Sequence, residues 1–533
     1  MSTSSHDTTF IVTSDGRPVE RFFQGYFFHE ADFVFGEEGL TRFEAATGIA
    51  VSGGLDGCYV IAHREGDSLV FSTDHAGYKM LYYYHDGSTW AVSNSLAQIV
   101  DFLRASRIAI TPNYSQLANI MAPGTASSQL FSHETTVRNI RLAPRSTNLV
   151  VRPDRVAFEP WAEVPAEEYR VGLGNHLDTW VRRFETFALT PGIGVSVDIT
   201  GGLDSRTNFG LITLAKKRLG GQGAYPRLNC GFTPTKTDDL DVAVQLTDHY
   251  GLALNDERKF PGYPLSSQEC YQRFRDLNVG VSYTLYQVVE GPTPNQISFG
   301  GAGGETQRKF YENHIRSKDI SLLFKSYGSR LKYRWLSEEF VRDAWASLDA
   351  IEGPGSDPLR RYYREFRNRY HSGRAPRYSV QFTPLDSVTA DIAQSQAGQD
   401  RLDDGQFLYD IFASADENLI DMPFDSPSKA PSAQVRANLT RAEIPSDARP
   451  GRVWAAETEP RQAFQTSAER NRLLQAAVNR AAQDPFVARF WGEELVEIAN
   501  GLLEDLLAGR SLGNAINGKP ISALLAAHRA SPS

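Results

Sequence analysis

The sequence predicts an α+β amino-terminal domain with layered sheets, followed by an α/β domain with a parallel sheet and a mostly helical carboxy-terminal part. Three observations predict this. Residues 10–156 contain short apolar runs separated by turn residues, as in antiparallel sheets. Strand-like and helix-like segments alternate over 167–299, and from 317 onward helical patterns prevail. Two domains are therefore expected, 1–160 and 161–533.

The first domain is expected to be an antiparallel sheet layered with helices. Turn residues, such as Glu65-Gly66-Asp67, separate its apolar runs. A helix is expected at 94–105. The expected strands are 22–28, 58–63, 69–72, 81–84 and 90–93.

The second domain begins with a helix-like segment at 167–189. Its expected strands are 195–199, 228–232 and 296–299, with a helix after the first strand and another at 239–252. Strands that alternate with helices form parallel sheets, and such sheets bind ligands at the carboxyl ends of their strands.

Composition bounds the class of protein. The chain has 533 residues and a formal net charge of −9, so a broad nucleic-acid-binding surface is not expected. The cysteines, Cys58, Cys230 and Cys270, lack metal-ligand spacing and fit a reducing compartment. No signal peptide and no run of 18 apolar residues is visible, so we expect a cytoplasmic protein without a membrane partner. The tail, 494–533, is expected to be a pair of packing helices.

One stretch of the second domain has the composition of an anion-binding turn. The strand 195–199 runs into Thr200 and two glycines, and a helix-like pattern follows. Glycines let the backbone approach a ligand, and the free amides of a helix start favour phosphate. The carboxylate of Asp204 would repel phosphates unless a divalent metal lay between them. We therefore expect nucleotide phosphates and Mg²⁺ to bind at Thr200, Gly201, Gly202, Leu203, Asp204 and Ser205.

A near copy of this stretch occurs at 51–57. A strand, 58–62, follows it directly, so no helix start is available there. This copy is predicted to be a turn without a ligand.

A second glycine-rich turn follows the strand 296–299 and carries one carboxylate, Glu305. If both turns end strands of one sheet, Asp204 and Glu305 meet on one Mg²⁺, with the triphosphate as a further ligand. The chain has no Gly-x-x-x-x-Gly-Lys-Ser/Thr motif, so simple γ-phosphoryl transfer is not indicated.

The first turn resembles the Ser-Gly-Gly-Leu-Asp-Ser signature of the ATP pyrophosphatases, specifically of their asparagine synthetase branch. In the amino-terminal part, 71–83 is similar to a hairpin of the glutaminase domain of that family. The resemblance extends to about Pro431. Further segments resemble motifs of the branch in the same order, namely 237–243, 299–305, 383–386 and 423–429.

The resemblance implies an Ntn-hydrolase-like first domain and an adenine nucleotide α-hydrolase-like (PP-loop) synthetase domain. It implies ATP and Mg²⁺ as cofactors, with Asp204 and Glu305 as metal ligands. Lys429 lies in the segment that carries the synthetase lysine, and it is expected to stabilise charge while an amine attacks. The remaining nucleotide contacts are expected from Phe232, Gly300 and Gly301.

Three positively charged residues near these turns are further candidates. A cation on the first turn of a helix is electrostatically disfavoured, so Arg206 is expected to be a catalytic residue that contacts phosphate or substrate. Arg308 and Lys309 follow the second turn, and they are expected to hold phosphate or a substrate carboxylate.

The chain also departs from the family pattern. A glutaminase of this type uses the amino-terminal cysteine as its nucleophile, whereas here Ser2 follows Met1 and the first cysteine is Cys58. Glutamine hydrolysis is therefore not expected. The same loss marks β-lactam synthetases and lasso-peptide cyclases, which adenylate a carboxylate that an amine then attacks. Glu305-Thr306 also replaces the usual Asp-Glu.

These features predict an ATP-dependent, AMP-forming carbon–nitrogen ligase. Its partner is expected to be a small molecule or peptide that carries a carboxylate and an amine, and the chain is a possible homodimer. One alternative is an ATP pyrophosphatase that acts on a large partner such as tRNA. Another is a pseudoenzyme that only binds ATP or a partner peptide.

Overall fold

The computed structural model describes residues 6–122, 128–162, 166–231, 237–308, 334–350, 358–458 and 461–532. Phe232 and Lys309 lie outside these ranges, so the predictions made for them are not tested.

The amino-terminal region contains two sheets that pack face to face, where the sequence led us to expect one antiparallel sheet layered with helices. One sheet has the strand order β1-β7-β6-β8, and the other has the order β10-β9-β5-β4-β2-β3-β17. Phe22, Phe71 and Leu149 belong to the buried core between them. The strands are β1 (Ile11–Thr13), β2 (Arg21–His29), β3 (Asp32–Phe35), β4 (Asp56–Glu65), β5 (Ser68–Thr73), β6 (Tyr82–Asp86), β7 (Thr89–Ser93), β8 (Ile140–Leu142), β9 (Thr147–Val151), β10 (Val156–Pro160) and β17 (Val453–Trp454).

Helices cover this region. The helix α1 (Gly36–Thr47) packs through Leu40 and Phe43 on β2 and β3. The predicted helix at 94–105 is α2 (Leu96–Ala105), whose start is capped by the Ser95 side chain. A short helix, α3 (Tyr114–Asn119), follows it.

The second region contains a four-stranded sheet in the order β12-β11-β15-β16, and every neighbouring pair is parallel. The pairing places Val197 of β11 beside Phe299 of β15, and Phe299 beside Phe382 of β16. The bounds are β11 (Gly194–Asp198), β12 (Arg227–Asn229), β15 (Gln296–Phe299) and β16 (Val380–Phe382).

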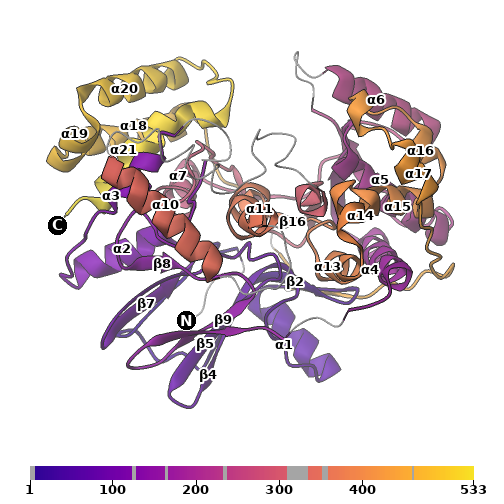
Figure 1. Cartoon of the computed structure of the whole chain (residues 1–533), viewed down its shortest axis with the longest axis horizontal. Helices are drawn as coiled ribbons and strands as arrows, with labels where there is room; N and C mark the ends of the chain where they lie inside the picture. Colours follow the sequence, from indigo (N-terminus) through magenta and orange to yellow (C-terminus); the bar gives the residue numbers. More distant parts are fainter. Residues whose placement is uncertain are drawn as a thin grey trace.

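The helices of this region pack on the parallel sheet and on one another. The helix α4 contacts α5 and α13, and α5 contacts α15. Figure 1 shows these helices grouped with α6 on the side of the molecule away from α18–α21. In chain order, the helices from residue 169 to residue 437 are α4 (Tyr169–Leu189), α5 (Leu203–Leu219), α6 (Thr237–His249), α7 (Ser267–Leu277), α10 (Arg334–Asp349), α11 (Pro358–Tyr362), α12 (Arg369–His371), α13 (Val388–Ser395), α14 (Gln399–Asp403), α15 (Gln406–Ala415), α16 (Asn418–Asp421) and α17 (Ala433–Ala437). Of these, α7 packs instead on α2 and α18, and α10 packs on α3.

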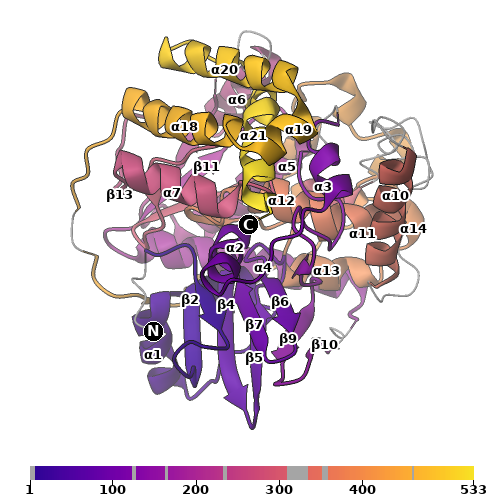
Figure 2. The ribbon, with the colours of Figure 1, turned by 90° about the vertical axis from the view of Figure 1, so that its left-hand side faces the viewer.

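The carboxy-terminal helices form a separate layer, which lies at the top in Figure 2. They pack on one another and on α2, α3 and α7. The predicted packing of the tail is confirmed, because α20 buries one face with residues such as Leu503, and α21 is buried on nearly all sides, Leu524 included. The helices are α18 (Ser467–Ala482), α19 (Pro485–Trp491), α20 (Glu493–Leu507) and α21 (Lys519–Ala530).

The two regions share a continuous aromatic core. The rings of Phe28 in β2 and Phe382 in β16 lie 4.5 Å apart, and Trp180 of α4 packs on both. The chain also returns to the first region, because β17 pairs in parallel with β3. The observed architecture is the mixed α/β fold with layered sheets that the sequence predicts, but residues 453–454 complete the amino-terminal sheet from beyond the predicted boundary at 160.

In the ranges that the structure describes, no helix combines the length and the apolar character that crossing a bilayer requires.

Candidate functional site

Three loops meet at the carboxyl edge of the parallel sheet. They follow β11, β15 and β16, as the parallel order of these strands requires. A Cβ atom added to Gly301 would lie 2.8 Å from the Ser205 amide nitrogen, and one on Gly304 would lie 2.0 Å from Asp204 Oδ1. A Cβ atom on Gly303 would lie 2.7 Å from the Cβ of Asp386. The two turns selected from the sequence are therefore in direct contact.

The first loop is held in shape by its own hydroxyl groups. The Thr200 amide donates to Ser205 Oγ at 3.0 Å, and the Gly202 amide donates to Thr200 Oγ1 at 3.2 Å. The helix α5 begins directly after Gly202, which provides no side-chain cap, so amides of its first turn remain available to a ligand. Asp204 lies in this turn, where the helix dipole favours an anion.

A carboxylate already lies against one amide of this loop. The Gly201 amide donates to Oδ1 of Asp239, on the first turn of α6, at 3.1 Å. A negatively charged oxygen thus occupies the position at Gly201 where a phosphate oxygen is expected. The backbone of the loop binds an anion in this structure, and here that anion belongs to the protein.

Asp204 is neutralised by Arg308. The guanidinium donates to both carboxylate oxygens of Asp204, at 2.8 and 3.1 Å. Burial raises the pKa of Glu305, and the neighbouring Asp204 carboxylate raises it further. Burial acts to lower the pKa of Arg308, but the carboxylates of Asp204 and Glu305 outweigh it and raise that pKa. These three side chains form one charged cluster.

This cluster fits a divalent cation in part. Oε2 of Glu305 is buried and has no hydrogen-bond partner within the described residues, and Gly304 leaves open the space beside Asp204. Across those same ranges, no three His, Cys, Asp or Glu side chains converge as a metal-binding group. Two carboxylates with phosphate and water oxygens suit Mg²⁺, which is commonly held by one or two protein carboxylates.

Lys429 lies beside the first loop. A Cβ atom on Gly202 would be 3.8 Å from Lys429 Nζ. Nζ donates to Asp425 Oδ2 at 2.6 Å, and the backbone amide of Asp425 donates to the Gly201 carbonyl at 3.1 Å. The Tyr409 hydroxyl donates to the Lys429 carbonyl at 2.8 Å. Lys429 and the first loop are more than 220 residues apart in the sequence, and the structure brings them together.

Arg206 has a different place from the one the sequence suggests. Its side chain is buried, its guanidinium donates to the carbonyls of Leu419, Met422 and Pro423, and its plane stacks on Phe424 at 3.7 Å. Burial lowers its pKa to about 10. These contacts hold the segment that leads to Lys429, in place of the predicted contact with phosphate.

The other predicted residues divide between the site and its surroundings. The Gly300 amide donates to the Phe382 carbonyl at 3.0 Å, so this glycine continues the sheet rather than facing the first turn, as Gly301 does. The near copy at 51–57 has no helix, as predicted: it turns with Gly54 at a φ of +86°, and its last two residues already belong to β4.

Sequence reasoning missed Asp425, the partner of Lys429. The spacing of four residues between these opposite charges is a usable signal, because residues four apart face each other in helical turns.

Asp386 appeared only within a resembling motif. The structure shows that its Oδ2 accepts from the Tyr78 hydroxyl at 2.9 Å and so links this loop to the amino-terminal region.

Neither the models of known protein families nor the curated proteins contain a match to this chain.

Proposed function

We propose that this protein is an ATP-dependent, AMP-forming amide-bond synthetase that works without glutamine hydrolysis. One observation carries the proposal. Asp204 and Glu305, on turns after neighbouring parallel strands, adjoin the start of α5, and Lys429 lies at the same loop. The proposal includes the Ntn-like and PP-loop assignments of the two regions, which rest on the sequence motifs.

The proposed reaction has two steps. A carboxylate oxygen of the substrate attacks the α-phosphorus of ATP, and the bond to pyrophosphate breaks, which gives an acyl-adenylate. An amine then attacks the acyl carbon, loses a proton, and displaces AMP. The site residues supply electrostatic stabilisation, which is commonly the largest contribution to such catalysis.

Each site residue has a proposed task in this reaction. Asp204 and Glu305 would hold Mg²⁺, which supplies charge neutralisation for the departing pyrophosphate. Amides of the first turn of α5 bind phosphate oxygens. Lys429 stabilises the negative charge that develops when the amine attacks, and Arg206 positions the segment that carries Lys429.

The amine is proposed to come from the substrate itself. Cys58 lies buried in β4, and burial raises the pKa of its thiol far above the usual value, so the reactive thiolate is disfavoured. This supports a substrate that carries both a carboxylate and an amine.

ATP–pyrophosphate exchange tests the proposal. The protein is incubated with Mg²⁺, labelled pyrophosphate and a panel of amino-carboxylic acids and peptides, and exchange is expected with at least one class. Asp204→Asn is expected to lower the exchange rate by about 10²- to 10³-fold. The control is Asp421→Asn, whose side chain is 69% exposed and pairs with Arg436 on the surface. Equal rates for the two variants would contradict the proposal.

A second candidate function is an ATP-binding or peptide-binding scaffold. Two contacts favour it. Arg308 binds Asp204 where a cation is expected, and Asp239 binds the Gly201 amide where a phosphate oxygen is expected. Calorimetry separates the two functions. Tight binding of Mg²⁺–ATP together with no exchange for any carboxylate would favour the scaffold.

A further inference from the structure

A large cleft lies between the two regions, and its inner end adjoins the loops described above. Its volume is about 1240 Å³, and it is lined by residues of β6, β8 and β10 on one side and of α10, α11 and α13 on the other. In Figure 1, α10 and α11 lie above β8 and β9. Pockets for drug-sized ligands span about 300–1,000 Å³, so this cleft has room for an extended ligand.

The lining of the cleft is positively charged. Among the described residues that line it are seven arginines and four carboxylates, an excess of three positive charges. The whole chain carries a formal charge of −9. A positive concave surface on an acidic protein focuses the electric field on anions and raises their local concentration.

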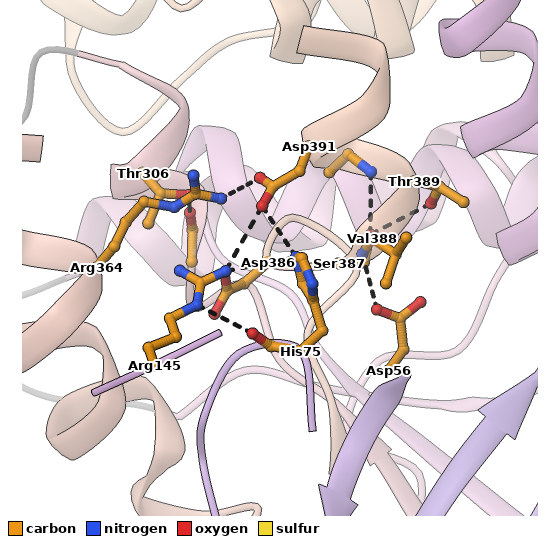
Figure 3. Close-up of polar contacts among 12 residues, drawn as sticks. Asp56, His75, Arg145, Thr306, Arg364, Asp386, Ser387, Val388, Thr389 and Asp391 are labelled. Atoms are coloured by element: carbon orange, nitrogen blue, oxygen red, sulfur yellow. Dashed lines mark hydrogen bonds and ion pairs between the residues drawn. The ribbon is translucent and has the colours of Figure 1, made fainter. Parts of the chain in front are cut away.

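The inner end of the cleft already holds a carboxylate between two arginines. Figure 3 shows Asp391 accepting hydrogen bonds from Arg364 and His75, with Arg145 as an ion-pair partner at 3.5 Å. Burial acts to raise the pKa of Asp391, but Arg364, His75 and Arg145 hold it far below its usual value. Nε of Arg364 is buried without a hydrogen-bond partner in the described part of the chain. This end of the cleft therefore already binds carboxylate oxygens, which belong to Asp391.

The mouth of the cleft presents arginines that a ligand can reach. The side chains of Arg141 and Arg342 are 54% and 68% exposed, and their partners are rim carboxylates such as Glu134. Tyr83 and Phe158 form an edge-to-face aromatic pair on the wall, 5.5 Å between centroids. Charged donors beside an aromatic wall suit a chain that carries both carboxylates and apolar atoms.

The cleft also adjoins the loops at the sheet edge. The pKa of Arg364 is raised by the charge of Asp391 and then of Asp386, although burial acts to lower it. Asp386 packs on Gly303, and Thr306 of the same loop lies beside Arg364 in Figure 3. A ligand at the inner end of the cleft is thus one layer of side chains away from the loop that carries Glu305.

We propose that this cleft binds an acidic peptide segment, with side-chain carboxylates on its arginines. The carboxylates in the lining disfavour a nucleic acid, whose phosphates repeat along the whole strand. The volume disfavours a single small polycarboxylate. Binding here requires neither nucleotide nor turnover, so the proposal stands or falls independently of the synthetase assignment.

Fluorescence anisotropy with the full-length protein tests this. A fluorescein-labelled oligoglutamate peptide is expected to bind, and an oligoglutamine peptide of equal length is not. The double variant Arg141→Gln/Arg342→Gln is expected to weaken binding about tenfold or more, because it removes two charge-assisted contacts. The matched control is Arg42→Gln/Arg510→Gln, whose side chains are 53% and 62% exposed and each pair with one carboxylate outside the cleft.

Each replaced side chain is on the surface, so all variants are expected to fold. Thermal melting verifies this. Four results would overturn the proposal: no binding of oligoglutamate, equal binding of oligoglutamine, equal weakening by the control pair, or stronger competition by oligothymidylate. Competition by free citrate at the same concentration as the peptide would overturn the assignment to a peptide.

Discussion

Arg308 occupies the position that a bound cation is expected to take at this site. Its guanidinium contacts both oxygens of Asp204, and the buried carboxylate of Glu305 lies within electrostatic range. Without a positive charge here, two neighbouring carboxylates would repel each other in a partly buried site. Arg308 therefore stabilises the ligand-free arrangement, and a divalent ion would compete with it for Asp204.

Replacing Arg308 by Gln should make the protein depend on Mg²⁺. We expect the free energy of unfolding to fall by about 1–3 kcal/mol, since the pair is only partly exposed and its loss leaves the carboxylates uncompensated. Added Mg²⁺ should restore much of this loss in the variant and change the wild type little. Thermal melting with Mg²⁺ or with a chelator measures both effects.

The control for this experiment is Arg510→Gln, which breaks an exposed pair with Asp505. Its melting temperature should respond to Mg²⁺ as the wild type does. An equal response of the Arg308 variant would show that no cation site lies between the two loops.

His176 makes stability sensitive to acid. This residue of α4 is fully buried, and its Nδ1 lies 3.0 Å from Oγ1 of Thr389. Burial lowers its pKa to about 3, and Arg183 adds to the shift. In the unfolded chain its pKa is about 6.5, so below that pH the unfolded state gains a proton that the folded state does not bind. Stability is therefore lost as pH falls from 6.5 toward 3.

Between pH 7.5 and pH 5.5 this histidine should cost about 1.4 kcal/mol of unfolding free energy. His176→Asn cannot take up a proton and retains a polar atom near Thr389. We expect the variant to lack this part of the pH dependence, whatever its stability at pH 7.5. Urea denaturation at the two pH values measures the difference. Parallel curves for the two proteins would contradict the role of His176.

At the level of elements, the site depends on loops that touch through glycines. A Cβ atom on Gly304 would lie 2.0 Å from Oδ1 of Asp204, closer than two non-bonded atoms can approach. Gly304→Ala should therefore push the second loop away from α5. We expect a loss of about 1–3 kcal/mol in stability and loss of Mg²⁺–ATP binding, measured by thermal melting and calorimetry. Gly231→Ala, two residues after β12, places its new Cβ more than 4 Å from the atoms of the described residues beyond its chain neighbours and should be neutral.

The meeting of these loops could be predicted from the sequence, because each turn follows a strand-like run and parallel strands align their carboxyl ends. The strands β16 and β17 could not. They have three and two residues, and each is defined by a partner far away in the chain. The same reason explains why the prediction for Arg206 differs from its observed contacts, since its carbonyl partners lie more than 200 residues away in the sequence. A local pattern shows that a buried cation needs acceptors, but not which distant carbonyls supply them.

At the scale of the whole molecule, the two regions are joined by a buried ion pair. Nη1 of Arg183, in α4, donates to Oδ2 of Asp56, in β4, at 2.7 Å, and both side chains are about 5% exposed or less. Asp56 also accepts from the Val388 amide at the start of α13, at 2.8 Å (Figure 3). The Arg183 guanidinium stacks on Trp180 at 4.3 Å. One carboxylate thus joins three elements from the two regions.

Removal of one partner should loosen both regions together. Asp56→Ala leaves the Arg183 charge buried and unpaired, so we expect a loss of about 3–5 kcal/mol. The double variant Asp56→Ala/Arg183→Met removes the charge too and should recover part of that loss, because much of the cost comes from the uncompensated guanidinium. Breaking the exposed pair of Glu38 and Arg42 should cost less than about 1 kcal/mol.

Hydrogen exchange read out by mass spectrometry shows where the loss is felt. In Asp56→Ala, peptides from β4 and from α13 should lose protection to the same extent, because a shared aromatic core and this ion pair make the two regions unfold as one unit. Loss of protection confined to β4 would mean that the parallel-sheet region is stable by itself. The amino-terminal layers would then be a separately folding domain, and the cleft between the regions would be free to open and close around a ligand.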